Sequence, residues 1–170
     1  MDATETLLSR RSIRKYTTEP VSDEAIKSLL KAAMAAPSAG NQQPWHFVVI
    51  RDRAILDEIP KRHPYAQMVK DAPVAIVVCG DARSVKYKDY WPQDCAAASE
   101  NLLLAAHANN LGAVWCGVYP NEDRVHPFRE LLGIPDGVFP FALIALGHPD
   151  EEKPPGERFD ASRVHANRWT

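Results

Sequence analysis

The sequence is poor in cysteine and lacks any long apolar run. Only three cysteines occur among 170 residues, and no two of them form a CxxC pair, so we expect reduced thiols rather than a disulfide framework or a structural zinc site. No apolar run approaches the roughly 18 residues of a membrane span, and the N-terminus begins with acidic rather than basic residues. These features predict a cytoplasmic protein without a membrane partner.

An excess of one charge is also missing. The formal net charge is −2, so the chain lacks the basic field that holds nucleic acid or an anionic membrane surface, and neither partner is expected. GxGxxG and P-loop motifs are absent, which leaves a Rossmann or kinase-like fold without support. With 45% apolar residues, the chain is long enough to build one compact core of ordinary domain size.

Helix and strand patterns are plentiful. An Asp2 and Glu5 capping box predicts a short first helix with Leu7 and Leu8 as its apolar edge, and apolar residues at a 3.6-residue period predict a helix from Ser22 to about Ala36. Further helices are expected around 55–59, over 94–111 and over 123–132, the last of them closed by Gly133 and Pro135. Strands are expected over 46–50, 74–79, 113–118 and 141–146.

The expected helix 94–111 is rich in alanine and leucine on more than one face. This composition predicts a helix that is buried on all sides, and its small side chains would let another helix approach closely. Gly112 is expected to end the helix in the left-handed conformation. After Gly147 the composition changes to prolines and charges, although Phe159, Val164 and Trp169 are spaced along the segment as apolar anchors. We therefore expect a domain over 1–148 and an extended tail over 149–170 that wraps over a surface, which in a dimer is that of the partner subunit.

Two segments carry candidate binding chemistry. Residues 10–14 place three arginines and a serine where a helix is expected to end, a pattern that suits phosphate oxygens but also a solvated basic turn. Residues 36–45 form a proline-bracketed loop of small residues and side-chain amides, which suits the edge of a flat ligand but also an ordinary connection with Trp45 as a core anchor.

Together these segments, RRSIRKY and APSAGNQQPWHF, resemble the FMN-binding nitroreductase family. The resemblance continues through WPQDCAAASENLLLAAHANNLGAVWCGVYP, LLGIP and the closing ERFDASRVHANRW, and it covers nearly the whole chain in the manner of the short single-domain members. It implies an α+β fold, a three-layer sandwich with a mostly antiparallel central sheet flanked by helices, in a domain-swapped homodimer with FMN at the interface.

The same resemblance implies an FMN-dependent NAD(P)H oxidoreductase. NADH or NADPH would be the electron donor, nitroaromatics, quinones or similar small molecules the acceptors, and the kinetics ping-pong. The chemistry would be carried by FMN, with no catalytic side chain and with Arg14 as an electrostatic tuner. The cofactor-binding residues implied are Arg10, Arg11, Ser12 and Arg14, then Pro37, Ser38, Ala39, Asn41 and Gln43 from the other subunit, Trp115, Cys116 and Gly117, and Arg158 at the phosphate.

Several alternatives stay open at this point. The chain could be a flavin-binding module for storage, sensing or degradation, or a dehalogenase or oxidase of the same fold. Cys116 could be a nucleophile or a buried structural thiol, and Asp94 and Glu100 could be acids or ordinary helix N-terminal carboxylates. The role of the segment 65–70 in flavin binding is undetermined, and Gly40 suggests a mobile loop. The histidines are too scattered to predict a metal site.

Overall fold

The computed structural model describes residues 1–83 and 85–169. Its helices are α1 (Ala3–Ser9), α2 (Asp23–Met34), α3 (Arg53–Arg62), α4 (Trp91–Ala108) and α5 (Glu122–Leu132), with short 3-10 turns at Ala39–Asn41, Gln67–Lys70, Lys88–Tyr90 and Ala161–Arg163. Its strands are β1 (Trp45–Ile50), β2 (Val74–Asp81), β3 (Gly112–Gly117) and β4 (Val138–Gly147).

The four strands form one sheet in the order β1-β2-β4-β3, and all neighbouring pairs are antiparallel. β1 and β3 are therefore the edges. Every residue of β2 is buried, and β4 is buried along almost its whole length, as expected for strands covered on both faces. A bulge between Val78 and Cys79 shifts the register of β2 against β4.

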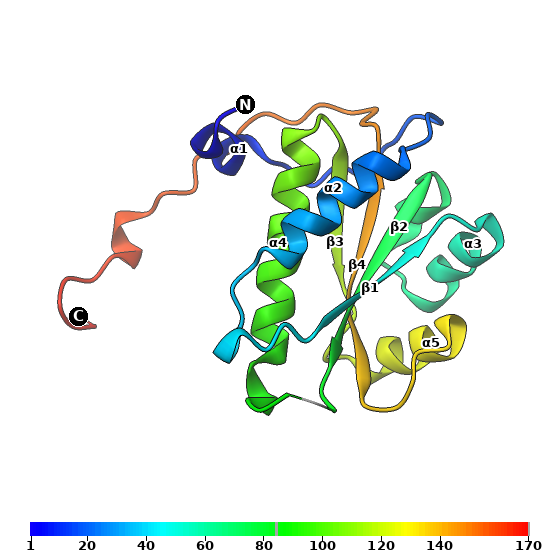
Figure 1. Cartoon of the computed structure of the whole chain (residues 1–170). Coiled ribbons are helices and arrows are strands. Elements are labelled where there is room, and N and C mark those ends of the chain that lie inside the picture. The colour runs from blue at the N-terminus through cyan, green and yellow to red at the C-terminus, as the bar shows by residue number, and fades with distance from the viewer. Residues whose placement is uncertain (84, 170) are drawn as a thin grey trace.

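Helices cover both faces of the sheet (Figure 1). α2 and α4 pack on one face, around a core that includes Leu29 and Leu102, while α3 and α5 pack on the other, around Leu56 and Phe128. The predicted α+β three-layer sandwich with an antiparallel sheet is thus confirmed. Within the described residues, none of the helices is both long enough and apolar enough to cross a lipid bilayer.

The predicted helix signals act as caps. The Asp2 side chain accepts a hydrogen bond from the Glu5 N–H at 2.8 Å, and the Ser22 hydroxyl accepts one from the Ala25 N–H at 3.1 Å. Gly133 ends α5 in the left-handed conformation, with φ of +63°. These three local predictions are confirmed.

The predictions for α4 need correction. The helix begins at Trp91, three residues before Asp94, and ends at Ala108. Its left-handed stop is Asn110, with φ of +57°, whereas Gly112 is the first residue of β3. A side chain at Gly112 would clash, since its Cβ would lie 2.6 Å from the Ile13 side chain. The helix is also not buried all round in the single chain, because Leu104 and several alanines on one face are half-buried.

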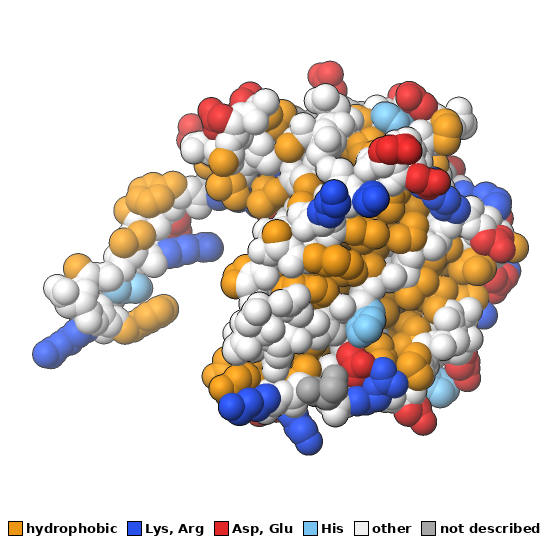
Figure 2. Space-filling model, in the orientation of Figure 1, with side chains coloured by type: hydrophobic (Ala, Val, Ile, Leu, Met, Phe, Trp, Pro, Cys, Tyr) orange, Lys and Arg blue, Asp and Glu red, His pale blue; other side chains and the backbone are white. Residues whose placement is uncertain are grey.

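The C-terminal segment stands away from the body of the molecule (Figures 1 and 2). Phe159, Val164 and Trp169, the expected apolar anchors, are 86%, 66% and 89% exposed. Thr170, the last residue of the predicted tail, lies outside the described residues. The beginning of the tail, residues 149–154, bonds to residues 11–16 of its own chain. The three apolar anchors beyond it are exposed, which leaves the wrapping of a partner as a prediction.

Candidate functional site

The arginine motif lies along the edge of the sheet. α1 ends at Ser9, and Arg10 leaves the helical conformation. Ser12 then forms a parallel bridge with Ala113, and the Ile13 N–H donates to the Ala113 carbonyl at 3.0 Å. The motif is therefore fixed against β3 and is not a free basic turn. Arg10 pairs with Glu100 of α4, with Nε 3.3 Å from Oε1, so Glu100 holds an arginine of the motif.

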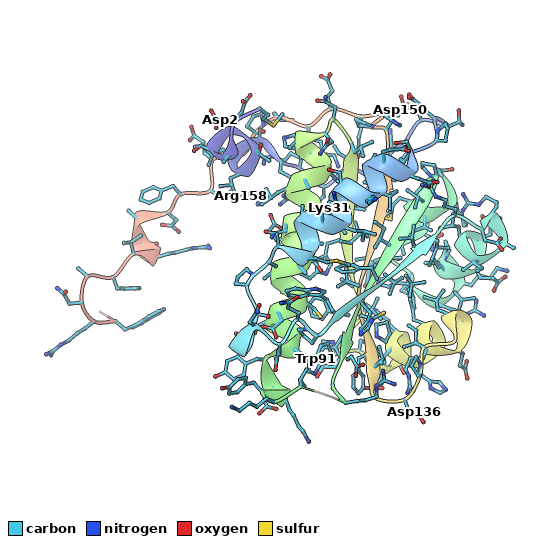
Figure 3. All side chains as sticks on the ribbon, in the orientation of Figure 1. Asp2, Lys31, Trp91, Asp136, Asp150 and Arg158 are labelled. Carbon is cyan, nitrogen blue, oxygen red and sulfur yellow. The ribbon has the colours of Figure 1, made fainter. Side chains whose placement is uncertain are left out.

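One hydrogen-bond donor of the Arg11 side chain has no acceptor among the described residues. Its Nε donates to the Pro154 carbonyl at 2.9 Å and its Nη1 to the Arg10 carbonyl at 2.6 Å, but Nη2 is buried without a partner among the described residues. A Cβ at Gly156 would lie 3.2 Å from this Nη2 and 3.9 Å from Nε of Arg158. Arg158 lies beside α1, where the tail leaves the body (Figure 3). Two guanidinium groups thus converge on one glycine, a combination suited to an anion.

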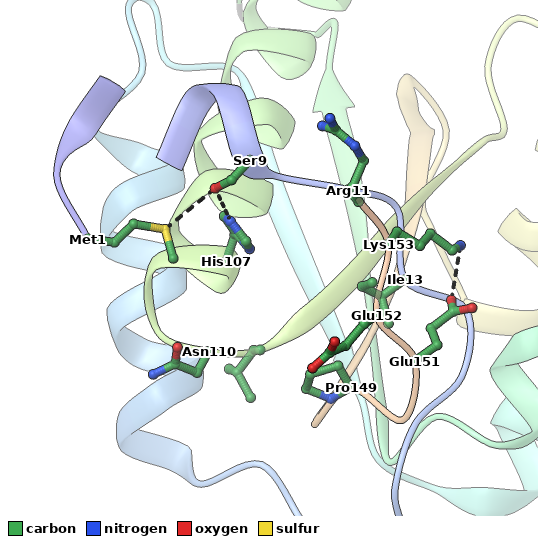
Figure 4. Close-up of a pocket in the computed structure, with 11 residues that line it drawn as sticks. Met1, Ser9, Arg11, Ile13, His107, Asn110, Pro149, Glu151, Glu152 and Lys153 are labelled. Atoms are coloured by element: carbon green, nitrogen blue, oxygen red, sulfur yellow. Dashed lines mark hydrogen bonds and ion pairs between the residues drawn. The ribbon is translucent and has the colours of Figure 1, made fainter. Parts of the chain in front are cut away.

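The segment after β4 closes this region from the other side. Lys153 Nζ donates to the Ser12 carbonyl at 2.7 Å and lies 3.1 Å from Glu151 Oε1. The same Glu151 oxygen accepts a hydrogen bond from the Arg14 N–H at 2.5 Å. These contacts hold the pKa of Glu151 below its ordinary value, the Arg14 N–H being the largest cause. A cavity of 300 Å³ lies beside Arg11 between the two segments (Figure 4).

Sequence reasoning missed Glu151 and Lys153. Their signal was an acid and a base two residues apart in a proline-bordered segment that otherwise suggested a solvated tail. Across the same cavity, the Ser9 hydroxyl lies 2.7 Å from His107 Nε2 (Figure 4). Because Ser9 already donates to the Glu5 carbonyl, it accepts from His107, and the pair joins α1 to α4.

The exposed end of β3 brings together the next three predicted residues. Trp115 is half-buried against Phe141, with ring centroids 5.5 Å apart. Cys116 is only 6% exposed, and burial raises the pKa of its thiol, which favours the structural-thiol interpretation. Gly117 is exposed, and a Cβ built on it would meet no atom within 4 Å. The strand therefore ends in an open backbone surface that a flat ligand could approach closely.

Two side chains fix the Gly117 carbonyl. His63 Nε2 lies 2.9 Å from this oxygen, and Arg124 Nη1 donates to it at 2.8 Å. The Tyr65 N–H donates to His63 Nδ1 at 3.3 Å, which assigns the proton of the neutral ring to Nε2. Burial, more than the nearby Arg124 charge, lowers the pKa of His63. His63 thus acts on the site as a neutral donor, a role that sequence reasoning missed.

The residues of the segment 65–70 lie in two different places in the structure. Cys116 Sγ lies 3.7 Å from the Tyr65 carbonyl oxygen and 4.0 Å from Met68 Sδ, so these two residues border the end of β3. The Tyr65 side chain is exposed under the Arg124 guanidinium, 5.4 Å from the ring centroid. Lys70 instead lines a separate hollow.

The small-residue loop before β1 is tightly bent. Gly40, Asn41 and Gln43 have φ of +56°, +53° and +48°. The Ser38 hydroxyl accepts from the Gln43 N–H at 3.0 Å, and the Gln43 amide donates to the Asn41 side chain at 2.9 Å. Trp45, at the start of β1, is buried as the expected core anchor. Pro37 is exposed and Ala39 half-buried at the mouth of the loop.

The loop does not meet the arginine motif within one chain. It precedes β1, and the strand order puts three inter-strand spacings, about 14 Å, between β1 and β3. No hydrogen bond or ion pair between described residues joins it to 10–14 or to Gly117. The predicted site residues therefore form two groups: the motif, the end of β3 and Arg158 on one side, and the loop on the other.

The antiparallel sheet lies between helical layers, and the arginine motif runs beside its edge strand β3. The Nitroreductase family profile matches residues 7–63 and 60–148, and the chain belongs to this family. It is 52% identical over 169 residues to a Methanothermobacter thermautotrophicus protein that bears the provisional name NADH dehydrogenase/NAD(P)H nitroreductase, covering 99% of this chain and 88% of that one.

Two solved structures extend the comparison. An FMN-dependent nitroreductase from Clostridium difficile R20291 superposes with a TM-score of 0.91 at 31% identity, covering 98% of this chain and 99% of that one. A provisionally named nitroreductase from Desulfovibrio desulfuricans, crystallised in complex with FMN, superposes with a TM-score of 0.85 at 35% identity, covering 100% and 99%.

Proposed function

We propose that this protein is an FMN-dependent oxidoreductase that takes electrons from NADH or NADPH and reduces nitroaromatics, quinones or similar small acceptors. The observation that carries the proposal is the buried Arg11 Nη2, which has no acceptor among the described residues and lies next to Arg158, in a segment that runs beside the edge strand ending in the open backbone at Gly117. The family, whose members compared above include an FMN-dependent enzyme and an FMN complex, supports it.

The residues present fit FMN. The two guanidinium groups of Arg11 and Arg158 would hold its phosphate, with Arg10 and Ser12 beside them. Ala113 and Gly117 are four residues apart on β3, about 13 Å along the strand, so the ring would lie at the Gly117 end near Trp115 and Cys116. FMN, when bound, supplies the two-electron chemistry that links nicotinamide to acceptor.

Arg14 is the residue we assign to electrostatic tuning. Its charge opposes the effect of burial on the pKa of both Tyr16 and Cys116, so its field reaches the residue next to Gly117. A cation there favours negative charge on a ligand at this edge. Since His63 is neutral and Cys116 is a raised-pKa thiol, we expect no indispensable proton-donating side chain.

We further propose that the enzyme is a homodimer in which the loop of residues 37–43 completes the site of the partner, through Pro37, Ser38, Ala39, Asn41 and Gln43. The division into a domain over 1–148 and a tail over 149–170 follows from the same idea. Support comes from the exposed Phe159 and Trp169 of the tail, and from a largely apolar groove formed by α1, α2 and α4. Light scattering of the full chain and of a chain ending at 148 tests it, and a full-length monomer that retains FMN would contradict it.

The functional experiment is an anaerobic visible spectrum of the FMN-loaded protein. We expect NADH or NADPH to bleach the flavin absorption and a nitroaromatic or quinone to restore it, with parallel lines in double-reciprocal plots, as ping-pong kinetics require. FMN that binds but is bleached by neither nicotinamide would refute the reductase and favour the flavin-binding module. Absence of FMN binding would refute the whole proposal.

A further inference from the structure

Asp94 is a buried carboxylate whose two oxygens both reach into the loop before β1. The side chain lies near the start of α4, and the residue is 5% exposed. Oδ1 accepts from the Ala39 N–H at 2.9 Å, and Oδ2 accepts from the Gln42 amide at 2.9 Å. These hydrogen bonds span more than fifty residues of sequence, and they are charge-assisted and shielded from water, which strengthens them.

Gln42 also connects the loop to a third segment, the one that contains Tyr87. Its amide nitrogen also donates to the Tyr87 carbonyl at 3.2 Å, and its amide oxygen accepts from the Tyr87 N–H at 3.1 Å. The Tyr87 ring in turn packs on Gly40, where a Cβ would lie 2.5 Å from the ring. The loop is therefore held from α4 on one side and covered by Tyr87 on the other.

The loop needs such a restraint because its conformation is unfavourable by itself. Asn41 and Gln43 both adopt the left-handed region, which non-glycine residues occupy at a cost. The contacts within the loop, Ser38 to Gln43 and Gln43 to Asn41, satisfy its own polar groups. They do not attach it to the rest of the protein. Only Asp94 and the Gln42 bridge to Tyr87 do so through side-chain hydrogen bonds among the described residues.

We propose that Asp94 is the positioning residue that holds the 37–43 loop in its flavin-binding shape before the cofactor arrives. This inference rests on the proposed function. It sets aside the catalytic-acid role left open by the sequence, since both oxygens accept from donors of the loop, and it gives this first-turn carboxylate of α4 a specific partner. Preorganisation of this kind raises affinity by removing the ordering cost from the binding step.

The chemistry of the pair suggests a sharp test. In Asp94→Asn the new amide has one acceptor oxygen for two donors, so either Ala39 or Gln42 faces a second N–H group. Adding Gln42→Glu supplies a carboxylate that accepts from the new amide nitrogen, while the remaining amide oxygen at position 94 still accepts from Ala39. The double variant restores the total charge and both contacts to position 94. It also places an acceptor oxygen where the Gln42 amide nitrogen donated to the Tyr87 carbonyl, so that bond is replaced by repulsion. Asp89→Asn, an exposed acid just before α4, is the matched control.

Two readouts are needed, amide hydrogen exchange of the apoprotein and FMN affinity by quenching of flavin fluorescence. We expect Asp94→Asn to speed exchange at Ala39 and Gln43 at least tenfold, with β2 amides unchanged, and to raise the Kd for FMN about tenfold or more. The double variant should recover part of both effects, and Asp89→Asn should match the wild type. Exchange and affinity that are unchanged in Asp94→Asn would overturn the inference while leaving the proposed function standing.

Other outcomes are equally decisive. Wild-type protein that binds no FMN would refute the proposed function, whereas the exchange rates would still report whether Asp94 holds the loop. Faster exchange at β2 as well as the loop, without recovery in the double variant, would show a general structural role and refute the positioning role.

Discussion

A substitution at Gly117 should affect cofactor binding and protein stability in opposite directions. It is the last residue of β3, its φ lies outside the left-handed region, and a Cβ there would meet nothing within 4 Å. Gly117→Ala therefore adds a methyl group to open space in the apoprotein. Because alanine restricts the unfolded chain more than glycine does, we expect the variant to be more stable by about 0.4–1 kcal/mol, which raises Tm by about 1–4 °C for a chain of this size.

The effect on the cofactor should have the opposite sign. If the flavin packs on the Gly117 backbone, the methyl group occupies space that the ring needs, and overpacking of one methyl costs about 1–3 kcal/mol. That penalty corresponds to a Kd for FMN raised about 5- to 150-fold. Thermal unfolding of the apoprotein and titration of FMN fluorescence measure the two effects separately.

A companion variant checks the geometric reasoning. At Gly80 a Cβ would lie 2.1 Å from the Trp91 ring, so Gly80→Ala should lower apoprotein stability by about 1–3 kcal/mol. An unchanged Kd for FMN in Gly117→Ala would refute the placement of the flavin at the end of β3. A fall in the apoprotein Tm of Gly117→Ala would instead refute the open space assigned to its Cβ.

Three further predictions follow from single side chains. Arg158→Gln should weaken FMN binding about tenfold or more but leave riboflavin binding unchanged, because only FMN carries the phosphate; equal losses for both would contradict the assignment. Burial lowers the pKa of His63 in the folded protein, so the unfolded chain binds more protons. The contribution of neutral His63 to the free energy of unfolding should therefore be fully present above about pH 6.5 and be lost as the pH drops through the pKa of the folded state. Urea unfolding at pH 7.5 and 5 should show this loss, and His63→Gln should reduce it. Burial raises the thiol pKa of Cys79 to about 12 and also raises those of Cys95 and Cys116. A disulfide reagent at pH 8 should therefore react slowly with the native protein, whereas it should label three thiols in the denatured protein.

Local signals in the sequence were reliable where one residue acts on its neighbours. Ser22 and Gly133 begin and end their helices as expected, and the β-branched runs at 46–50 and 74–79 lie within β1 and β2. The start of α4 was placed too late because Tyr90 provides no side-chain cap. Pro92 in the first turn was the available signal, since proline is favoured at that position.

Long-range contacts could not be predicted in this way. Asp94 suits any helix N-terminus, so its sequence position says nothing about Ala39, which lies 55 residues earlier. His63 follows the end of α3 and finds its partner at Gly117, 54 residues later. The sequence pattern identified the segments that form the candidate site, but it did not identify the residues that hold those segments in place, because only the folded arrangement of the strands brings these residues together.

The position of Arg158 connects cofactor binding with assembly. Arg158 adjoins Arg11 around Gly156, and the next residue, Phe159, is the first of the exposed apolar residues of the tail, which a second copy would cover under the proposed homodimer. In that homodimer the loop contributed by the second copy would be the other half of the same site. Separation of the two chains would therefore free the segment beyond Arg158 and remove the loop in one step. A ligand that binds only the assembled form stabilises it by mass action, so FMN and the second subunit should each strengthen the binding of the other.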